Sequence, residues 1–157
     1  MAIRFRDSGT DICVEFSGTV VDRFRKFYQR KDDYESGGML FSNVFHDSKL
    51  RVTYISTPTD RDIACKSFFQ HDRRESQKLI DSLFSHGLHY VGDWHSHFEK
   101  QPKPSVKDIQ SMKAVYNNSQ HELKFMLHVI VGSSDDFRNA YVCITDGVSV
   151  RKLECID

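Results

Sequence analysis

GDWHSHFEKQPKPSVKD, residues 92–108, runs from the end of an apolar segment into the start of a helical pattern. In an extended strand, side chains two residues apart point to the same side, so His95 and His97 can present two imidazoles to one ion. Ser105 and Asp108 follow a proline at the spacing of a helix N-terminal capping pair. The stretch therefore predicts a strand, a proline-containing loop and a helix, with polar side chains brought together where these parts meet.

Each half of this stretch also has an ordinary structural interpretation. Most of the eight histidines are expected to be solvated or satisfied by backbone carbonyls, and Ser105 with Asp108 alone favours a simple helix cap. The two interpretations of Asp108 are compatible, because the first turn of a helix holds its side chains rigidly and can still supply an oxygen ligand. Two imidazoles, one carboxylate and an open fourth position describe a catalytic zinc site, in which the pKa of bound water falls to about 7.

Hydrolysis at such a site also needs a base for the attacking water. Glu35 is a candidate because it stands just before Gly37 and Gly38, at the start of a predicted strand where glycines let another backbone or a substrate come close. Taken alone, a glutamate in this position is typical of a solvated strand end. Its combination with the histidines, the serine and the aspartate makes Glu35 the predicted base.

Length and composition point to one folded domain spanning residues 1–157. Hydrophobic residues make up 39% of the chain and aromatic residues 12%, which is enough apolar material for one core. The 22 basic and 22 acidic residues cancel, so the sequence has no electrostatic footprint for nucleic acid. Four cysteines without a paired spacing, and no apolar run near the roughly 20 residues of a membrane span, favour a cytoplasmic protein with free thiols and no membrane contact.

Hydrophobic periodicity predicts a mixed order of strands and helices without internal repeats. Strands are expected at residues 3–5, 12–16, 34–45, 50–56, 88–94, 124–132, 139–145 and 148–156. Helices are expected at residues 18–29, capped by Ser17, at 72–86, stopped by Gly87, and at 104–118. A hairpin turn is expected at residues 46–49 and an irregular loop at 57–71. The predicted fold class is therefore α/β, with a mixed central sheet flanked by helices.

Taken together, the candidate site residues resemble the JAMM (MPN+) metalloprotease motif. Glu35 comes first, followed by His-Ser-His at residues 95–97, seven intervening residues, Ser105, two more residues and Asp108. These positions match the catalytic letters of the motif without a gap or a substitution.

The resemblance extends beyond the motif. FFQHDRRESQKLIDSL, residues 68–83, followed by YVGDWHSH, residues 90–97, looks like the bacterial JAB-domain proteins found beside ubiquitin-like conjugation genes. The resemblance covers residues 11–144 and implies a single-domain JAB/MPN fold, whose layers of helices, sheet and helices are related to those of cytidine-deaminase-type enzymes. One departure is Phe98, where relatives usually have proline, and we expect the two later prolines of the loop to stiffen it instead.

The resemblance also implies a role for each site residue. His95, His97 and Asp108 would hold one Zn²⁺ ion, with water completing the tetrahedron. Glu35 would accept a proton from that water and later give it to the leaving amine. Ser105 would donate a hydrogen bond to the developing oxyanion.

Two neighbours of the histidines have expected roles as well. Asp93 shares a strand face with His95 and His97 by the two-residue period, so it can orient one of the ligands, and an ordinary surface acid is the alternative interpretation. Trp94 should point the other way and pack in the core.

A substrate class follows from the same resemblance. In the family, the scissile amide usually joins the C-terminal residue of a ubiquitin-like protein to a lysine amine or a following peptide, and such an extended tail binds best along a strand edge. Bacterial versions accompany E1-like and E2-like enzymes in antiphage systems such as CBASS, where the conjugated protein is a cGAS-like nucleotidyltransferase. The expected function is a zinc-dependent isopeptidase that acts on the C-terminal tail of a ubiquitin-like or cGAS-like protein, either reversing conjugation or processing a precursor.

Two other functions compete with this one. Cytidine-deaminase-type enzymes need a Cys-x-x-Cys pair, which the sequence lacks. A catalytically inactive MPN-type scaffold or binding module would keep the fold without its metal ligands, and the complete set of catalytic letters argues against it.

Overall fold

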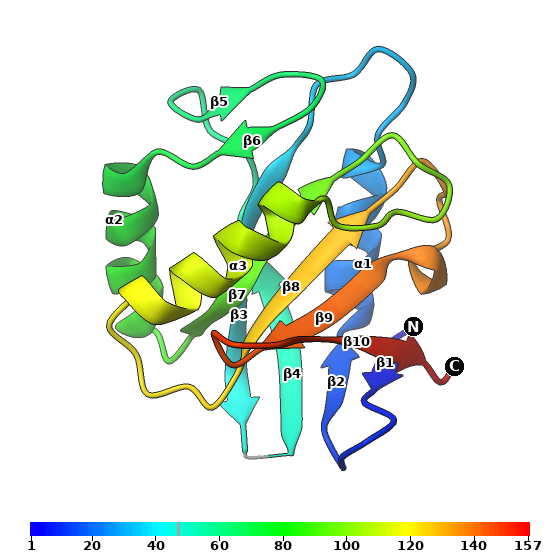
Figure 1. Cartoon of the computed structure of the whole chain (residues 1–157). Helices are drawn as coiled ribbons and strands as arrows, with labels where there is room; N and C mark the ends of the chain where they lie inside the picture. The colour runs from blue at the N-terminus through cyan, green and yellow to red at the C-terminus, as the bar shows by residue number, and fades with distance from the viewer. Residues whose placement is uncertain (47) are drawn as a thin grey trace.

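Across residues 1–46 and 48–157, the part of the chain that the computed structural model describes, eight strands form one mixed sheet that closes on itself (Figure 1). These strands are β1 (Ile3–Arg6), β2 (Cys13–Phe16), β3 (Gly37–Phe45), β4 (Lys49–Ile55), β7 (His89–Ser96), β8 (Met126–Val131), β9 (Tyr141–Thr145) and β10 (Val150–Cys155). Around the sheet they follow the order β1, β10, β9, β8, β7, β3, β4, β2. The pairs β2–β4 and β7–β8 are parallel and the other neighbours are antiparallel.

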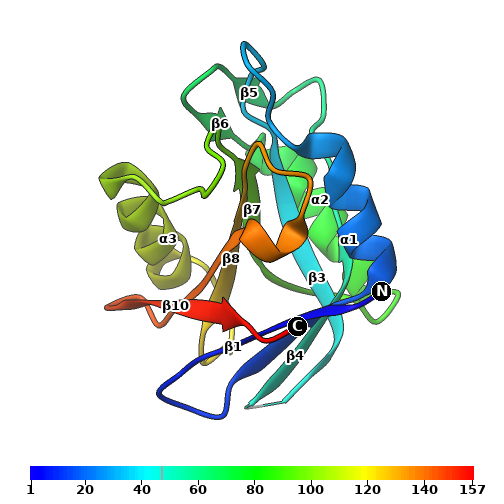
Figure 2. The same ribbon diagram turned by 90° about the vertical axis from the view of Figure 1, so that its right-hand side faces the viewer.

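Helices cover both sides of the central strands (Figure 2). On one side, α1 (Gly18–Phe24), continued by the short 3-10 helix η1 (Arg25–Phe27), packs on β4, and α2 (Arg73–Phe84) packs on β7. On the other side, α3 (Val106–Asn118) packs on β9. The predicted α/β fold, a mixed sheet flanked by helices, is therefore confirmed.

Polar side chains cap α1 and α2, and the cap of α1 is the predicted residue. Ser17 Oγ accepts a hydrogen bond from the Val20 N–H at 3.3 Å, and Asp72 Oδ1 accepts one from the Glu75 N–H at 3.0 Å. Gly87, just beyond α2, has a φ of 78°, which a residue with a Cβ rarely adopts. Helix α1 ends sooner than the periodicity predicts, because its last turn tightens into η1.

Aromatic rings from distant segments meet inside the barrel. Phe24 stacks on Phe137 with the ring centroids 5.0 Å apart, and its edge meets Trp94 at 5.3 Å. Phe5 of β1 joins the same group through Phe137 at 5.9 Å. The Trp94 side chain is 1% exposed and its Nε1–H donates to the Ser56 carbonyl at 3.0 Å, so the packing role predicted for it is confirmed.

Close packing also holds α3 against β8 and β9, and the start of β3 against Ser56. Met112 of α3 lies in a small buried cluster with Ile130 of β8 and Cys143 of β9. In β3, a Cβ added at Gly38 would lie only 2.3 Å from the Ser56 carbonyl oxygen. The close backbone approach predicted for this glycine is therefore present, and it holds the start of β3 against its neighbours.

Residues 57–71 differ from the predicted irregular loop. They contain a two-stranded hairpin, β5 (Ile63–Ala64) and β6 (Phe69–Gln70). Strands of two residues are too short for alternation to be visible in the sequence, so the pattern predicted only a loop.

The β3–β4 hairpin and the absence of a membrane-spanning segment were also predicted. β3 and β4 pair as expected, whereas Asp47, within the predicted turn at residues 46–49, lies outside the described residues. Among the helices that the structure describes, none has both the length and the apolarity required to cross a bilayer.

Candidate metal centre

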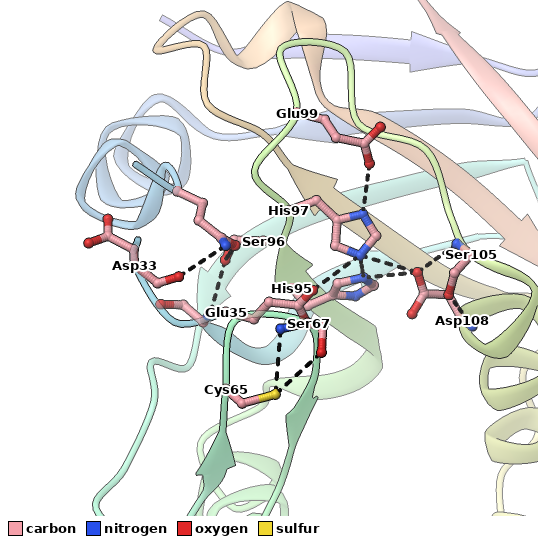
Figure 3. A network of polar contacts seen from close by, with 12 residues as sticks. Asp33, Glu35, Cys65, Ser67, His95, Ser96, His97, Glu99, Ser105 and Asp108 are labelled. Carbon is pink, nitrogen blue, oxygen red and sulfur yellow. Dashed lines mark hydrogen bonds and ion pairs between the residues drawn. The ribbon is translucent and has the colours of Figure 1, made fainter. Parts of the chain in front are cut away.

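The three predicted ligand atoms lie together beyond the carboxyl end of β7 (Figure 3). His95 Nε2 and His97 Nε2 are 3.1 Å apart, and Asp108 Oδ2 lies 3.4 Å from the first and 3.3 Å from the second. In a tetrahedral zinc site with bonds of about 2.0–2.1 Å, neighbouring ligand atoms are about 3.3 Å apart. The residues present therefore fit one tetrahedral ion in both chemistry and spacing.

The pairing of β7 with its neighbours places the His95 and His97 side chains next to each other. His95 lies in the interior of the sheet, where it is in register with Gly37 of β3 and Ile130 of β8. His97 follows the end of β7, and its backbone N–H donates to the Val131 carbonyl at 2.9 Å. The extended backbone therefore continues through both positions, and the two rings leave it on the same side.

Asp108 acts as a helix cap and faces the histidines at the same time. Its N–H donates to Ser105 Oγ at 3.0 Å, and its Oδ2 accepts a hydrogen bond from the Ser105 N–H at 2.8 Å. This reciprocal capping box fixes the orientation of the carboxylate. Ser105 is exposed beside the donors, so its hydroxyl hydrogen can point to a bound molecule.

Backbone contacts hold the loop between the second histidine and α3. Pro102 is buried against Gly132, where an added Cβ would lie 2.9 Å from the proline Cδ and 2.2 Å from the Glu99 carbonyl oxygen. The same carbonyl accepts a hydrogen bond from the Ser133 N–H at 2.8 Å. Pro102 is thus part of a rigid contact with the end of β8, while the Phe98 side chain is 54% exposed.

Glu35 lies beside the three donors in a buried position. Its side chain is 6% exposed, and its Oε1 is 3.5 Å from His97 Nε2. Burial raises the pKa of Glu35 to about 7, against the lowering effect of His97 and with a smaller raising effect of Asp108. Its backbone N–H donates to the Cys65 carbonyl at 2.7 Å, which ties it to the end of the β5–β6 hairpin.

A buried hydrogen-bond network behind Glu35 was not predicted from the sequence. Ser96 Oγ donates to Gln29 Oε1 at 2.9 Å and accepts a hydrogen bond from the Ser36 N–H at 2.8 Å. Gln29 Nε2 in turn donates to the Asp33 carbonyl at 3.2 Å (Figure 3). The network holds the segment that carries Glu35 against β7.

Charges in the centre shift the protonation of the donor groups. For Asp108, burial acts to raise the pKa, but hydrogen bonds from His95 and His97 outweigh it and the pKa is lowered. Burial lowers the pKa of His95, which leaves a neutral imidazole with a lone pair for a metal. Burial also acts to lower the pKa of His97, but contacts with Asp108, Glu35 and Glu99 raise it, and Glu99 Oε1 lies 3.3 Å from His97 Nδ1.

His128 takes the place beside His95 that was predicted for Asp93. His128 Nε2 lies 2.8 Å from His95 Nδ1. Asp93 instead lies 3.7 Å from His71, measured between Oδ1 and Nε2, and is hydrogen-bonded to the Tyr90 side chain. The prediction relied on the alternation within one strand, which cannot show that a residue of the neighbouring β8 is closer. A single polar residue in the apolar run MLHVIV is the signal that marks His128.

A cavity of about 640 Å³ opens beside the donors, between α3 and the β5–β6 hairpin with its adjoining residues. Phe68, Phe69, Met112 and Val115 give it apolar walls. Lys107 Nζ lies 5.4 Å from the centre of the Phe68 ring, so the helix and the hairpin are in contact at one edge of the cavity. A space of this size can hold several residues of an extended peptide.

A family model described as "Prokaryotic homologs of the JAB domain" (Prok-JAB) matches residues 18–144. The chain belongs to this family. This Prok-JAB chain is 31% identical over 135 residues to a Vibrio cholerae protein named "CD-NTase/cGAS isopeptidase", with 83% of each chain covered. It is 26% identical over 131 residues to an Enterobacter hormaechei protein of the same name, with 83% of this chain and 73% of the relative covered.

A solved structure has a similar fold. A protein from Desulfitobacterium hafniense, determined in solution, is similar to this Prok-JAB chain with a TM-score of 0.63 at 15% identity, over 88% of each chain. The family match confirms the JAB/MPN fold expected from the motif, and the closed sheet is compatible with it.

Proposed function

We propose that this Prok-JAB chain is a zinc-dependent isopeptidase that hydrolyses the amide bond after the C-terminal residue of a cGAS-like nucleotidyltransferase or a ubiquitin-like protein. The observation that carries the proposal is the tetrahedral spacing of His95, His97 and Asp108, with the Glu35 carboxylate 3.5 Å from His97. The names of the relatives support an isopeptidase and favour a cGAS-like substrate.

The proposal includes a biological setting. The reaction would reverse a conjugation or process a precursor in bacterial antiphage defence, with E1-like and E2-like enzymes as partners that make the conjugate. A reducing cytoplasm suits the chain, because Cys13, Cys65, Cys143 and Cys155 are all free thiols.

The chain's own side chains have separate tasks in this reaction. Zinc, when bound by His95, His97 and Asp108, supplies Lewis acidity that polarises a carbonyl group and acidifies water. Glu35 takes the proton of the attacking water and delivers it to the leaving amine, and its buried carboxylate 3.5 Å from His97 stands beside the place where the water would bind. The exposed Ser105 hydroxyl donates to the carbonyl oxygen as negative charge grows on it.

We place the substrate tail in the cavity between the β5–β6 hairpin and α3. The cavity adjoins the three donors, so a tail lying in it presents its last carbonyl to them. The cavity is lined by apolar side chains and by polar ones, which include Asp93 and His71. This mixed lining suits an extended peptide with mixed side chains.

Cleavage of a fusion protein tests the proposal. The substrate is a CD-NTase whose C-terminus continues into a short reporter protein, and the same assay is run with a ubiquitin-like fusion. The zinc-loaded wild-type chain should cut at the junction, and Glu35→Gln should be slower by roughly 10²- to 10⁴-fold because the base is lost. Glu122→Gln, which changes an exposed carboxylate in the segment before β8, is the matched control and should match the wild type.

Two outcomes would contradict the proposal at different points. Wild-type rates in Glu35→Gln would show that the base is assigned incorrectly. A zinc-loaded wild-type chain that cuts neither fusion would refute the proposed activity on these C-terminal tails.

A further inference from the structure

The first ligand histidine has a second imidazole directly behind it. His128 Nε2 on β8 lies 2.8 Å from His95 Nδ1 on β7, with the two ring centroids 4.9 Å apart. Ring nitrogens at this distance must share one proton, because two N–H groups would repel each other and two lone pairs would do the same. The contact therefore couples the tautomer of one ring to the tautomer of the other.

The other nitrogen of His95 decides which way the proton points. His95 Nε2 lies 3.1 Å from His97 Nε2 and 3.4 Å from Asp108 Oδ2. His95 Nε2 is therefore the nitrogen that would bind the metal. A nitrogen that binds a metal uses its lone pair, so the proton of a neutral His95 has to sit on Nδ1. His128 Nε2 is then the acceptor, and the proton of His128 has to sit on its own Nδ1.

We propose that His128 is a positioning residue that fixes the tautomer and the ring orientation of His95 for metal binding. The inference rests on the proposed function, since it takes His95 to be a zinc ligand. A partner that accepts the second N–H of a ligand histidine also makes the ring a stronger donor, and loss of such partners commonly costs roughly 10- to 100-fold in metal affinity.

The sheet holds His128 in this place. β7 and β8 are parallel neighbours in register, with Asp93 opposite His128. Leu127 and Val129, on either side of His128 in β8, point into the buried core, so His128 must face the opposite side, where the cavity and His95 lie. A ring placed by the central strands of a closed sheet is preorganised for its partner, whereas a loop residue would need ordering first.

Zinc affinity, measured without any substrate, tests the inference. The dissociation constant is obtained by competition with a chromophoric zinc chelator for the wild type, His128→Phe, His128→Gln and His86→Gln. His128→Phe keeps a ring of similar size but offers no acceptor, and it should bind zinc roughly 10- to 100-fold more weakly. His128→Gln offers a carbonyl oxygen near the position of Nε2 and should recover most of the loss.

The control variant changes a histidine away from the cavity. His86, beyond α2, is exposed and contacts the Ser82 carbonyl, so His86→Gln should bind zinc as the wild type does. Thermal unfolding of the metal-free variants separates a local loss of affinity from a loss of folding. Should His128→Phe fail to fold, the zinc affinity of His128→Gln and the histidine ¹H–¹⁵N spectrum of the wild type still decide the question.

A spectroscopic measurement reads the tautomer directly. In a long-range ¹H–¹⁵N spectrum of the zinc-loaded wild type, we expect protons on Nδ1 of both His95 and His128, and a bare Nε2 on His128. A proton on His128 Nε2, or zinc affinity of His128→Phe within twofold of the wild type, overturns the inference while the proposed isopeptidase stands. A wild-type chain that binds no zinc overturns both.

Discussion

The Ser105 side chain has two roles, as the cap of α3 and as the proposed hydrogen-bond donor to the oxyanion. Its Oγ accepts a hydrogen bond from the Asp108 N–H at 3.0 Å, which caps α3. Its hydroxyl hydrogen remains available on the exposed side, next to the donors of the metal centre. The two functions use different atoms of the hydroxyl group, so they can be separated by experiment.

Removal of this hydroxyl should reduce both stability and rate. Ser105→Ala is expected to lower the free energy of unfolding by about 1 kcal/mol through the lost cap. The same change should lower kcat by roughly 10²-fold, because the oxyanion loses one hydrogen-bond donor. Urea unfolding and cleavage of the fusion substrate measure the two effects.

Ser17→Ala is the matched control for this prediction. Ser17 caps α1 by accepting from the Val20 N–H at 3.3 Å, on the side of the sheet opposite α3. Its removal should cost a similar stability and leave kcat unchanged. A kcat of Ser105→Ala equal to that of Ser17→Ala would exclude the oxyanion role.

The site residues differ in how far a sequence can predict them. His95, His97 and Asp108 stand in one short segment, where a strand period and a helix cap fix their relative positions. Glu35 comes from the segment before the distant strand β3, and the resemblance to the JAMM motif was needed to join it to them. His128 reaches His95 through the register of two neighbouring strands. Neither periodicity nor spacing contains that information.

Among the elements, β1 and β10 close the sheet with the help of a buried charge. Asp7, just after β1, is 3% exposed and accepts a hydrogen bond from Thr10 Oγ1 at 2.6 Å. Arg151 of β10 lies 2.6 Å from the same carboxylate oxygen. The hydrogen bond from Thr10 lowers the pKa of Asp7, and the charge of Arg151 adds to this effect.

This carboxylate makes the stability of the closed sheet depend on pH. A lowered pKa in the folded state means that the stabilisation is fully present above the unfolded value, about 3.9, and is lost as the pH falls through the folded pKa. Asp7→Asn should therefore lower the free energy of unfolding at neutral pH by about 1 kcal/mol, a modest value because Arg151 stays in contact with solvent. The difference from the wild type should shrink below about pH 4.

Denaturant unfolding at a series of pH values measures this dependence. Asp157→Asn is a control, since Asp157 pairs with Arg4 near the same strands but at the surface. Its effect should be smaller than that of Asp7→Asn. A constant difference between Asp7→Asn and the wild type from pH 7 down to pH 3 would contradict the role given to Asp7.

Closure of the sheet and the β5–β6 hairpin both lay beyond prediction, for different reasons. β1 and β10 lie at opposite ends of the described chain, and a pairing between them leaves no local pattern. The strands β5 and β6 have two residues each, fewer than one full alternation requires. Longer strands and capped helices were predicted to within a few residues, because their period and their caps are local.

In the molecule as a whole, the hydrophobic core and the metal centre are separate. The core is built from β-strand residues and from aromatic rings such as Phe24 and Phe137, whereas the three proposed ligands are polar side chains of which only His95 is buried. The chain therefore has a large apolar core of which the proposed ligands are not a part. The chain should remain folded without metal, unlike a small zinc finger.

Removal of metal should consequently lower the stability without unfolding the chain. At a zinc concentration about 100 times the dissociation constant, binding stabilises the folded state by about 2.7 kcal/mol, which corresponds to roughly 5–10 °C in Tm for a chain of this size. A chelator should lower Tm by this amount and leave the far-UV circular dichroism at 25 °C unchanged. The zinc-saturated chelator is the control, and unfolding at 25 °C on chelation would contradict the separation of core and centre.

The zinc content of the purified chain shows whether His95, His97 and Asp108 form a metal site. After dialysis against metal-free buffer, elemental analysis should find about one zinc per wild-type chain, as expected for one tetrahedral site. Asp108→Asn, which keeps an acceptor for the Ser105 N–H but loses the charged ligand, should hold far less. Asp136→Asn, a surface change beside Arg138, should hold as much as the wild type. A wild-type chain that neither holds nor acquires zinc, or an Asp108→Asn chain with full occupancy, would contradict the account.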